Sequence, residues 1–301
     1  MKNNTIIEVM PQGFCGGVMK AIQIARQVRT DHPNEKITIL GNLVHNRYVK
    51  LALEHLRIET IERPGLTLLE LLDQIDSGIV IFTAHGVHPD VYAKAEAKGL
   101  TVFDASCRFV VQTQKIVQKK LDEGTAVFYI GKNHHPEAES IYTLSDRVFL
   151  IEKEEDIPVL DKETSVFVTN QTTMSTLDID HLFKAIEKKY PDAEFNNEVC
   201  GATRVRQEAV LALKDKPIDV LLVVGDPTSN NTEQLAAIGR MAGIPAVVKA
   251  ETVNDLKDCD WNEKRIAITS GASTPKYLTS QIIDFVKTGR TAPFSIEDVI
   301  S

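Results

Sequence analysis

The sequence changes character at residues 102–113, which read Val102-Phe-Asp-Ala-Ser-Cys107-Arg-Phe-Val-Val-Gln-Thr113. A short apolar run, typical of a β-strand, gives way at the cysteine to a segment with apolar residues every three or four positions, as in an amphipathic helix. Strands that alternate with helices indicate an α/β fold. The stretch therefore predicts an α/β protein in which Cys107 lies at a strand-to-helix turn.

Two other cysteines lie at the same kind of turn. Cys107 follows Cys15 by 92 residues (107 − 15), and Cys200 follows Cys107 by 93 residues (200 − 107). Helical patterns come after the three cysteines, at residues 16–28, 109–121 and 202–213. Because one more step of this length nearly reaches Ser301, the chain is predicted to contain three similar units in tandem.

Each unit also contains two strand-like runs that end in polar residues. They begin at Ile37 and Ile79, at Val127 and Ser165, and at Val220 and Arg265. Ligands of open α/β sheets bind outside the carboxyl ends of the strands. Three sheets around a pseudo-threefold axis would direct these polar residues and the three thiolates at one central cavity.

The repeat also sets the predicted boundaries of the three α/β units. The first unit covers residues 15–106 and the second covers residues 107–195. The third unit combines residues 1–14 with residues 196–285, and residues 286–301 form a C-terminal tail.

Composition is that of a soluble globular enzyme. Of the 301 residues, 43% are hydrophobic and 25% are charged, as in ordinary globular proteins. The apolar runs are far shorter than the roughly 18 residues of a membrane span, and residues 1–8 lack the apolar core of a signal peptide. We therefore expect a cytoplasmic protein without membrane partners. The net charge of −8 argues against nucleic acid as a partner, because basic surfaces bind it.

Four cysteines in a cytoplasmic chain are not a disulfide framework. No C-x2-C spacing supports a zinc ribbon, a thioredoxin-type redox pair or a bacterial ferredoxin motif. Two interpretations of Cys15, Cys107 and Cys200 stay open: thiolate ligands of an iron-sulfur cluster, or small side chains of the core. Their equivalent positions in the repeat favour the cluster, and a helix N-terminus favours thiolate sulfur. Cys259 lies outside the repeat and is interpreted as structural or exposed.

Three ligands would leave one iron of a four-iron cluster open to a substrate, as catalytic metal sites keep an unfilled position. The sequence has neither a G-x-G-x-x-G phosphate turn nor a P-loop. Electrons would therefore come from a separate carrier.

A series of short motifs runs in order from Gln12 to Ser273. It includes Gly13-Phe-Cys15, Val44-His45-Asn46-Arg47-Tyr48-Val49, Ala84-His85-Gly86-Val87, His135-Pro136-Glu137, Gln171-Thr172-Thr173, Cys200-Gly-Ala-Thr203 and Arg206-Gln-Glu-Ala-Val210. Together these motifs resemble the family of 4-hydroxy-3-methylbut-2-enyl diphosphate reductases, also called IspH or LytB.

The resemblance implies a three-domain α/β trefoil with one 4Fe-4S cluster per chain at its centre, held by Cys15, Cys107 and Cys200. The implied reaction is the reductive removal of the allylic hydroxyl, which gives isopentenyl and dimethylallyl diphosphate in the methylerythritol phosphate pathway, with a donor such as ferredoxin or flavodoxin. Glu137 is the implied proton donor, with Thr172 in its hydrogen-bond relay. The residues implied to contact the diphosphate substrate are His45, His85, His135, Thr172, Ser229, Asn230, Asn231 and Ser273.

The chain departs from the family pattern near the expected site. Arg108 replaces the usual Pro after the second cysteine, and Gly201 replaces a common Tyr after the third. Asp226-Pro227 and Asn230 change the phosphate loop, where an acid close to a diphosphate is unfavourable. These departures leave open a paralogue with the same cluster that reduces a different small molecule.

Other interpretations of the same residues also stay open. A cluster-based redox sensor is one, although it would not need Glu137 and Thr172 together. Glu137 could only cap a helix that begins near Pro136. Asn230 and Asn231 could be ordinary turn residues.

Overall fold

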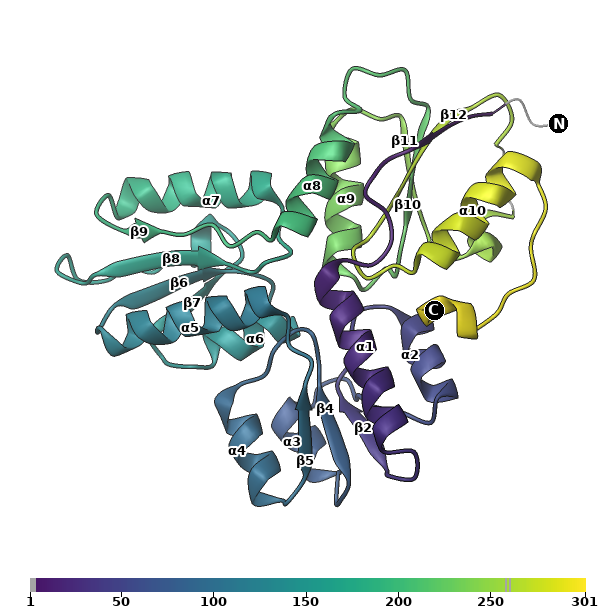
Figure 1. Ribbon diagram of the computed structural model, residues 1–301. Helices are drawn as coiled ribbons and strands as arrows, with labels where there is room; N and C mark the ends of the chain where they lie inside the picture. The colour runs from purple at the N-terminus through teal and green to yellow at the C-terminus, as the bar shows by residue number, and fades with distance from the viewer. Residues whose placement is uncertain (1–3, 258, 260) are drawn as a thin grey trace. The chain divides into compact units, whose positions relative to one another are not determined.

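The computed structural model describes residues 4–257, 259 and 261–301 (Figure 1). These residues form three four-stranded sheets with the strand orders β1-β12-β10-β11, β3-β2-β4-β5 and β7-β6-β8-β9. Neighbouring strands pair in parallel, as Leu222 of β10 does with Val248 on one side and Ile268 on the other. The predicted α/β class with three similar sheet-and-helix units is confirmed.

The chain divides into two compact units. Unit 1 takes in the described residues of Met1–Arg29, Val44–Glu59 and Gly201–Ser301, and it holds the sheet β1-β12-β10-β11. Unit 2 consists of Thr30–Leu43 and Thr60–Cys200 and holds the other two sheets. The boundaries expected from the sequence repeat stay a prediction.

In unit 1, helices cover both faces of the sheet, whose strands are β1 (Thr5–Glu8), β10 (Val220–Val224), β11 (Ala246–Ala250) and β12 (Arg265–Ser270). One set of strand residues packs with α10 (Lys276–Thr288), and the alternate set packs with α9 (Asn230–Met241). Because both faces are covered, β10 reads as an unbroken apolar run, Val220-Leu-Leu-Val-Val224. Unit 1 also contains α2 (Arg47–His55), α8 (Gly201–Leu211), the 3-10 helices Val253–Leu256 and Glu297–Ile300, and the beginning of α1 (Gly16–Asp31).

The first sheet of unit 2 contains β2 (Ile37–Leu40), β3 (Glu59–Ile61), β4 (Ile79–Phe82) and β5 (Thr101–Asp104). Helices α3 (Leu68–Asp73) and α4 (Pro89–Ala97) pack on it through an apolar core that includes Leu72, Val80 and Val91. Thr67 and Glu70 form a capping box that fixes the start of α3.

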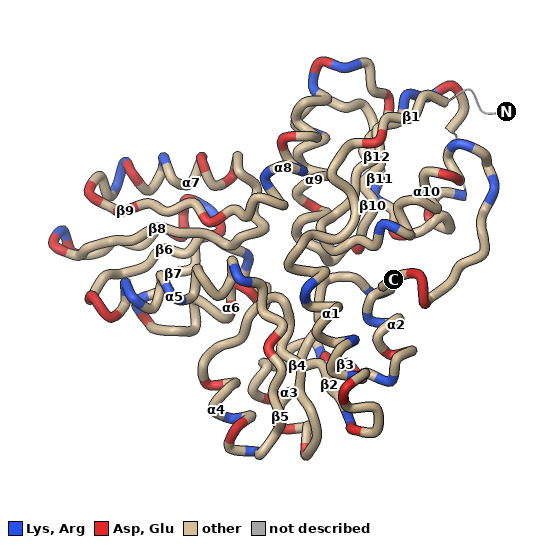
Figure 2. Tube along the Cα trace, in the orientation of Figure 1, with Lys and Arg blue, Asp and Glu red and all other residues tan. Residues whose placement is uncertain are grey.

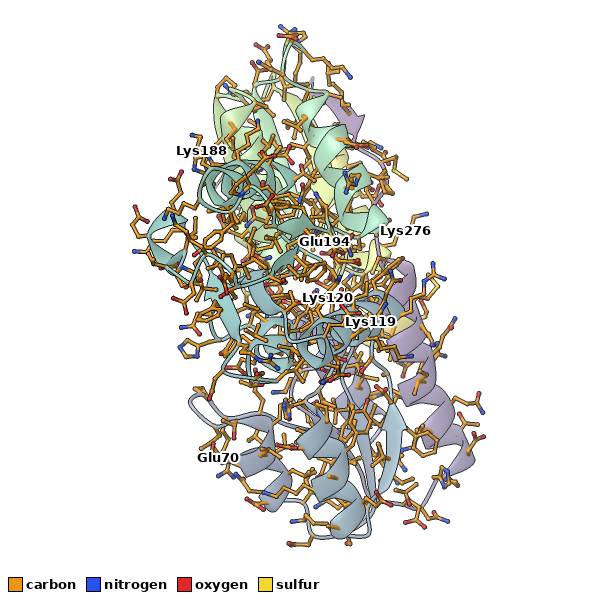
Figure 3. The ribbon with its side chains drawn as sticks, turned by 90° about the vertical axis from the view of Figure 1, so that its left-hand side faces the viewer. Glu70, Lys119, Lys120, Lys188, Glu194 and Lys276 are labelled. Atoms are coloured by element: carbon orange, nitrogen blue, oxygen red, sulfur yellow. The ribbon has the colours of Figure 1, made fainter. Side chains whose placement is uncertain are left out.

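The second sheet of unit 2 contains β6 (Ala126–Ile130), β7 (Val148–Ile151), β8 (Val166–Asn170) and β9 (Glu194–Phe195). Figure 1 shows α5 (Arg108–Asp122) and α6 (Pro136–Tyr142) on one face and α7 (Thr176–Lys189) on the other. The 3-10 helix Glu154–Asp156 follows β7. A salt bridge from Lys120 to Glu194, both labelled in Figure 3, joins α5 to β9.

The three sheets place the three cysteines alike. Strands β1, β5 and β9 are the ones that precede Cys15, Cys107 and Cys200, and each lies at the edge of its sheet, beside β12, β4 and β8 respectively. The sequence repeat is therefore a structural repeat.

The last residues of the chain pack against other segments of unit 1, to which they belong. Val299 and Ile300 are buried, and Arg26 of α1 donates a hydrogen bond to the carbonyl of Ile300. Figure 2 shows Lys and Arg interspersed with Asp and Glu along α7. Within the described ranges, every helix is too short or too polar to cross a bilayer.

Candidate functional site

Each repeated cysteine lies directly before a helix and is held there by an equivalent hydrogen bond. The cysteine N–H donates to a carbonyl two residues beyond the end of the neighbouring strand. The acceptors are Ala272 for Cys15 (N–O distance 2.9 Å), Ala84 for Cys107 (3.0 Å) and Thr172 for Cys200 (3.0 Å). All three side chains are partly exposed, and none forms a disulfide. The three turns thus present three thiols in the same local setting.

The three turns suit thiolate ligands of an iron-sulfur cluster. A helix N-terminus stabilises anionic sulfur, and none of the three cysteines is fully buried. Cys15 belongs to unit 1, whereas Cys107 and Cys200 belong to unit 2. Among the described residues, no three His, Cys, Asp or Glu side chains gather into a metal-binding group, so ligation by these cysteines is taken up below as a proposal. Cys259 instead packs against the β10-β11-β12 core that contains Trp261, in agreement with its structural interpretation.

A buried acid lies at the carboxyl end of the β6-β8 pair. Glu137, in the first turn of α6, is 2% exposed. Its Oε1 accepts a hydrogen bond from the Thr172 N–H at 2.6 Å, and its Oε2 accepts one from the Thr172 hydroxyl at 3.0 Å. Burial raises the pKa of Glu137 to about 7, although the two bonds from Thr172 act in the opposite direction. Near neutral pH the carboxyl group therefore keeps a proton that it can donate.

The N-cap of α6 is His135, whose Nδ1 atom accepts the N–H of Glu137 at 3.2 Å. Glu137 itself is an acid in the first turn of this helix, so its role as a proton donor stays a prediction. Ser140 donates to the carbonyl of Glu137, and Gln114 of α5 donates to Ser140. The first turn of α6 is thereby held in place.

Two of the expected histidines come together in unit 2. The rings of His85 and His135 pack edge to face with their centroids 5.6 Å apart. Since Nδ1 of His135 accepts a backbone N–H, the neutral ring carries its proton on Nε2 and can donate from there. Unit 2 thus gathers His85, His135, Glu137 and Thr172.

Four other expected residues come together in unit 1, at the N-terminus of α9. The Ser273 hydroxyl donates to the carbonyl of His45 at 2.9 Å and lies 3.4 Å from the Ser229 hydroxyl. Ser229 is the N-cap of α9 and accepts the N–H of Thr232. Asn231 accepts the N–H of Ala272 at 2.9 Å. A helix N-terminus with such polar groups suits an anion.

Asn230 and Asn231 lie in the first turn of α9. Asn231 is buried, and its amide donates to the Thr203 hydroxyl at 3.4 Å. The interpretation of this pair as ordinary turn residues is therefore wrong.

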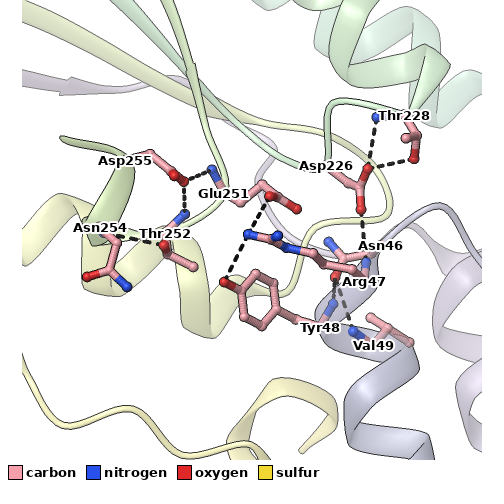
Figure 4. A network of polar contacts seen from close by, with 10 residues as sticks. All are labelled: Asn46, Arg47, Tyr48, Val49, Asp226, Thr228, Glu251, Thr252, Asn254 and Asp255. Carbon is pink, nitrogen blue, oxygen red and sulfur yellow. Dashed lines mark hydrogen bonds and ion pairs between the residues drawn. The ribbon is translucent and has the colours of Figure 1, made fainter.

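The acid that departs from the family pattern, Asp226, has a structural partner (Figure 4). One carboxylate oxygen accepts the N–H of Arg47 at 2.9 Å, and the other accepts the N–H and hydroxyl of Thr228 at 2.8 and 2.6 Å. The Asn46 side chain accepts the next two N–H groups of α2. Asp226 and Asn46 together satisfy the first three N–H groups of that helix. Through its bonds to Arg47 and Thr228, Asp226 also joins the start of α2, just after His45, to the loop before α9.

The sequence patterns gave no role to Arg47, Glu251 or Arg206, all of which make structural contacts in unit 1. The guanidinium of Arg47 forms an ion pair with Glu251 at 2.7 Å. Burial and the nearby Asp226 carboxylate raise the pKa of Glu251 to about 7, while Arg47 acts against them. Buried Arg206 donates to the carbonyls of Gly13 and Ala202 and so supports the Cys15 turn. Arg47 and Arg206 belong to the sequence motifs, whereas no pattern marks Glu251.

Removal of the Asp226 carboxylate tests this structural role. We expect Asp226→Ala to lower the free energy of unfolding by about 1–2 kcal/mol, because α2 loses a charged hydrogen-bond acceptor at its N-terminus. Urea or thermal unfolding measures the change. Asp215→Ala, which removes an exposed acid of the same unit, is the control and should have little effect. Equal stability of the two variants would contradict the assignment.

Comparisons with known proteins agree across nearly the whole chain. A family model described as LytB protein matches residues 6–287. Two relatives named 4-hydroxy-3-methylbut-2-enyl diphosphate reductase come from Bacillus cytotoxicus and Bacillus thuringiensis. They are 46% identical over 290 residues and 44% identical over 287 residues, and each alignment covers 94% of this chain and 90% of the relative.

Two solved structures of diphosphate reductases are also similar to this chain. The E-1-hydroxy-2-methyl-but-2-enyl-4-diphosphate reductase from Plasmodium falciparum is similar with a TM-score of 0.85 and 28% identity, over 94% of this chain and 88% of that one. A structure of (E)-4-hydroxy-3-methyl-but-2-enyl diphosphate reductase matches with a TM-score of 0.65 and 26% identity, over 95% of this chain and 99% of that one.

Proposed function

The chain belongs to the LytB protein family of 4-hydroxy-3-methylbut-2-enyl diphosphate reductases, and from this premise we propose how its own residues carry out the reaction. It is an oxidoreductase of isoprenoid biosynthesis that reduces this diphosphate to isopentenyl and dimethylallyl diphosphate. The observation that carries the proposal is the buried pair of Glu137 and Thr172, because a carboxyl group with a pKa of about 7 suits a proton donor to a leaving hydroxyl.

We propose that Cys15, Cys107 and Cys200 hold one 4Fe-4S cluster per chain. The three equivalent cysteine turns support this. When bound, such a cluster supplies reducing electrons and a Lewis-acidic iron. The arrangement requires the three α/β units, with the boundaries predicted from the repeat, to surround one cavity as a trefoil.

In the proposed mechanism Glu137 gives its proton to the hydroxyl oxygen of the substrate, which leaves as water. The carboxylate that forms keeps its hydrogen bonds from the N–H and hydroxyl of Thr172. These two donors offset part of the cost of a buried charge. Thr172 therefore holds Glu137 in position and stabilises its ionised form.

The diphosphate would be bound by neutral or titrating donors. In unit 1 these are His45, Ser229, Asn231 and Ser273, with Asn230 at the start of α9, whose N-terminus favours phosphate oxygens. In unit 2 they are His85 and His135. Asp226 is no obstacle, because its oxygens already accept three hydrogen bonds within unit 1.

The electron donor is proposed to be a ferredoxin or a flavodoxin, since the chain carries no nucleotide-binding fingerprint of its own. A cytoplasmic location is proposed as well. It is supported by four cysteines outside disulfides, which is usual in a reducing compartment. Family membership over nearly the whole chain favours the reductase over a paralogue or a redox sensor.

An assay on anaerobically prepared, cluster-loaded protein tests this function. With a chemical reductant we expect turnover of 4-hydroxy-3-methylbut-2-enyl diphosphate and at least a ~100-fold lower kcat/KM for the unphosphorylated alcohol, which cannot use the diphosphate hydrogen bonds. Growth rescue of a strain that lacks its own reductase is the control. Absence of both turnover and rescue with an intact cluster would sink the proposal and point to a changed substrate.

A further inference from the structure

A buried tyrosine next to the site has an unused hydroxyl group. Tyr129, the fourth of the five residues of β6, is 0% exposed, and its hydroxyl has no hydrogen-bond partner among the residues that the structure describes. Its ring packs in a cluster of apolar side chains that includes Val117 of α5, Ala138 of α6 and Phe167 of β8. A buried tyrosine hydroxyl ordinarily finds a partner, because leaving it without one destabilises the fold. The hydroxyl therefore calls for a functional explanation.

The ring of Tyr129 leans toward the end of the strand where Glu137 lies. A Cβ atom on Gly131, two residues further along the chain, would lie 2.9 Å from Cε1 of Tyr129 and 3.3 Å from Cβ of Ala138. The ring thus fills the space left by Gly131, beside the residue that follows Glu137. Any larger residue at position 131 would displace the ring from this place.

The surroundings keep the hydroxyl protonated. Burial raises the pKa of Tyr129 well above its ordinary value, and the charges of Glu137 on α6 and Glu198 after β9 add to this shift. The residues of α5 and β8 in the same cluster meet the ring with apolar side chains. Tyr129 is therefore an O–H donor, not a phenolate, throughout the working pH range.

Glu137 needs a further donor only after it reacts. Each of its oxygens accepts one hydrogen bond from Thr172, while an ionised carboxylate can accept about four. In the protonated state the demand for donors is smaller, because the carboxyl group carries its own O–H. Loss of the Glu137 proton creates a buried charge close enough to act electrostatically on Tyr129, whose hydroxyl is an unused donor.

We propose that Tyr129 is a positioning residue that donates a hydrogen bond, directly or through one water, to Glu137 once Glu137 has become a carboxylate. This inference rests on the proposed function, in which Glu137 supplies the proton. No bond of Tyr129 breaks: its proton stays on the phenol oxygen, and Glu137 recovers its own proton from solvent between turnovers. The tyrosine lowers the pKa of Glu137 relative to an apolar residue at the same place.

The variant Tyr129→Phe removes only the hydroxyl. In cluster-loaded protein, the ionisation of Glu137 is followed by the infrared band of its carboxyl group, which is identified by its loss in Glu137→Gln. We expect the midpoint of this titration to rise by about one pH unit, the size of one lost hydrogen bond to a charge. We also expect kcat to fall by about threefold to tenfold with KM unchanged, because a weaker acid donates its proton more slowly. The melting temperature should not fall, since the deleted group has no partner in the resting protein.

Tyr190→Phe is the matched control on the opposite face of the same sheet. The Tyr190 hydroxyl donates to the carbonyl of Pro158 at 2.6 Å and accepts the N–H of Leu160 at 2.9 Å. This variant should lower the melting temperature and leave the Glu137 midpoint where it was. An unchanged midpoint in Tyr129→Phe would overturn the inference and leave Tyr129 as a core residue. Because the midpoint is read without substrate, it decides this question even if the protein fails to turn over the diphosphate, a result that would refute the proposed function alone.

Discussion

The variant Glu137→Gln is expected to lose turnover by about 100-fold or more, the usual cost of removing a general acid. Gln keeps the size of the side chain and accepts a hydrogen bond from Thr172, but it has no proton to give. Substrate binding should persist, so the loss belongs to kcat. Steady-state kinetics with excess chemical reductant measures it. The wild-type rate should also fall as pH rises through about 7, where Glu137 ionises.

The pH dependence of the free energy of unfolding shows whether the loss of turnover in Glu137→Gln comes from the missing proton or from a loss of folded protein. The folded protein keeps the Glu137 proton up to a pH of about 7, whereas the unfolded chain releases it near the ordinary value of 4.5. The native state therefore binds the extra proton between these values, and Glu137 makes stability fall as pH rises through that window, by roughly 3 kcal/mol. Glu137→Gln should lack this contribution and keep the one from Glu251, whose pKa is also raised to about 7. Near-normal turnover of Glu137→Gln would show that another group supplies the proton.

Replacing any one of Cys15, Cys107 and Cys200 with Ser is expected to abolish the cluster and with it all turnover. A serine hydroxyl is a far poorer ligand for iron than a thiolate, and three ligands leave no spare. Anaerobically purified wild type should be brown and hold about four irons per chain. Iron analysis and the visible spectrum of each variant measure the loss.

Cys259→Ser is the matched control for these variants. Its side chain packs against the core of unit 1, so the iron content should stay at the wild-type level. Colourless protein with bound zinc, or loss of iron from Cys259→Ser alone, would contradict the assignment of the three ligands.

Local sequence patterns were enough to predict the helices that follow the three cysteines and two central strands of each sheet. The helical pattern at 16–28 corresponds to α1 at Gly16–Asp31, and the pattern at 109–121 corresponds to α5 at Arg108–Asp122. Strands such as β10 stand out because burial on both faces demands an unbroken apolar run. The structural repeat could be predicted from the equal spacing of the cysteines, because each one lies at the same strand-to-helix turn.

Contacts between distant segments could not be predicted in the same way. Asp226 looked unfavourable beside a diphosphate, yet its carboxylate accepts the N–H of Arg47, which lies 179 positions away. The unused hydroxyl of Tyr129 is equally invisible in the sequence, where the residue is one more aromatic in a strand. Such features depend on the direction of a side chain and on the satisfaction of its hydrogen bonds, and no periodicity encodes either.

The three cysteine turns differ in when they can form as the chain is made. The N–H of Cys107 bonds to Ala84 and that of Cys200 to Thr172, both of which are synthesised earlier, whereas that of Cys15 waits for Ala272, made 257 residues later (272 − 15). Strand β1 likewise pairs with β12, at the far end of the chain. Chains begin to fold from the N-terminus during synthesis. The Cys107 and Cys200 turns can therefore form on the growing chain, whereas the Cys15 turn can form only after Ala272 has been added. Assembly of the proposed cluster on three formed turns would therefore require synthesis at least as far as Ala272, and a chain truncated before β12 would lack the acceptor that holds the Cys15 turn.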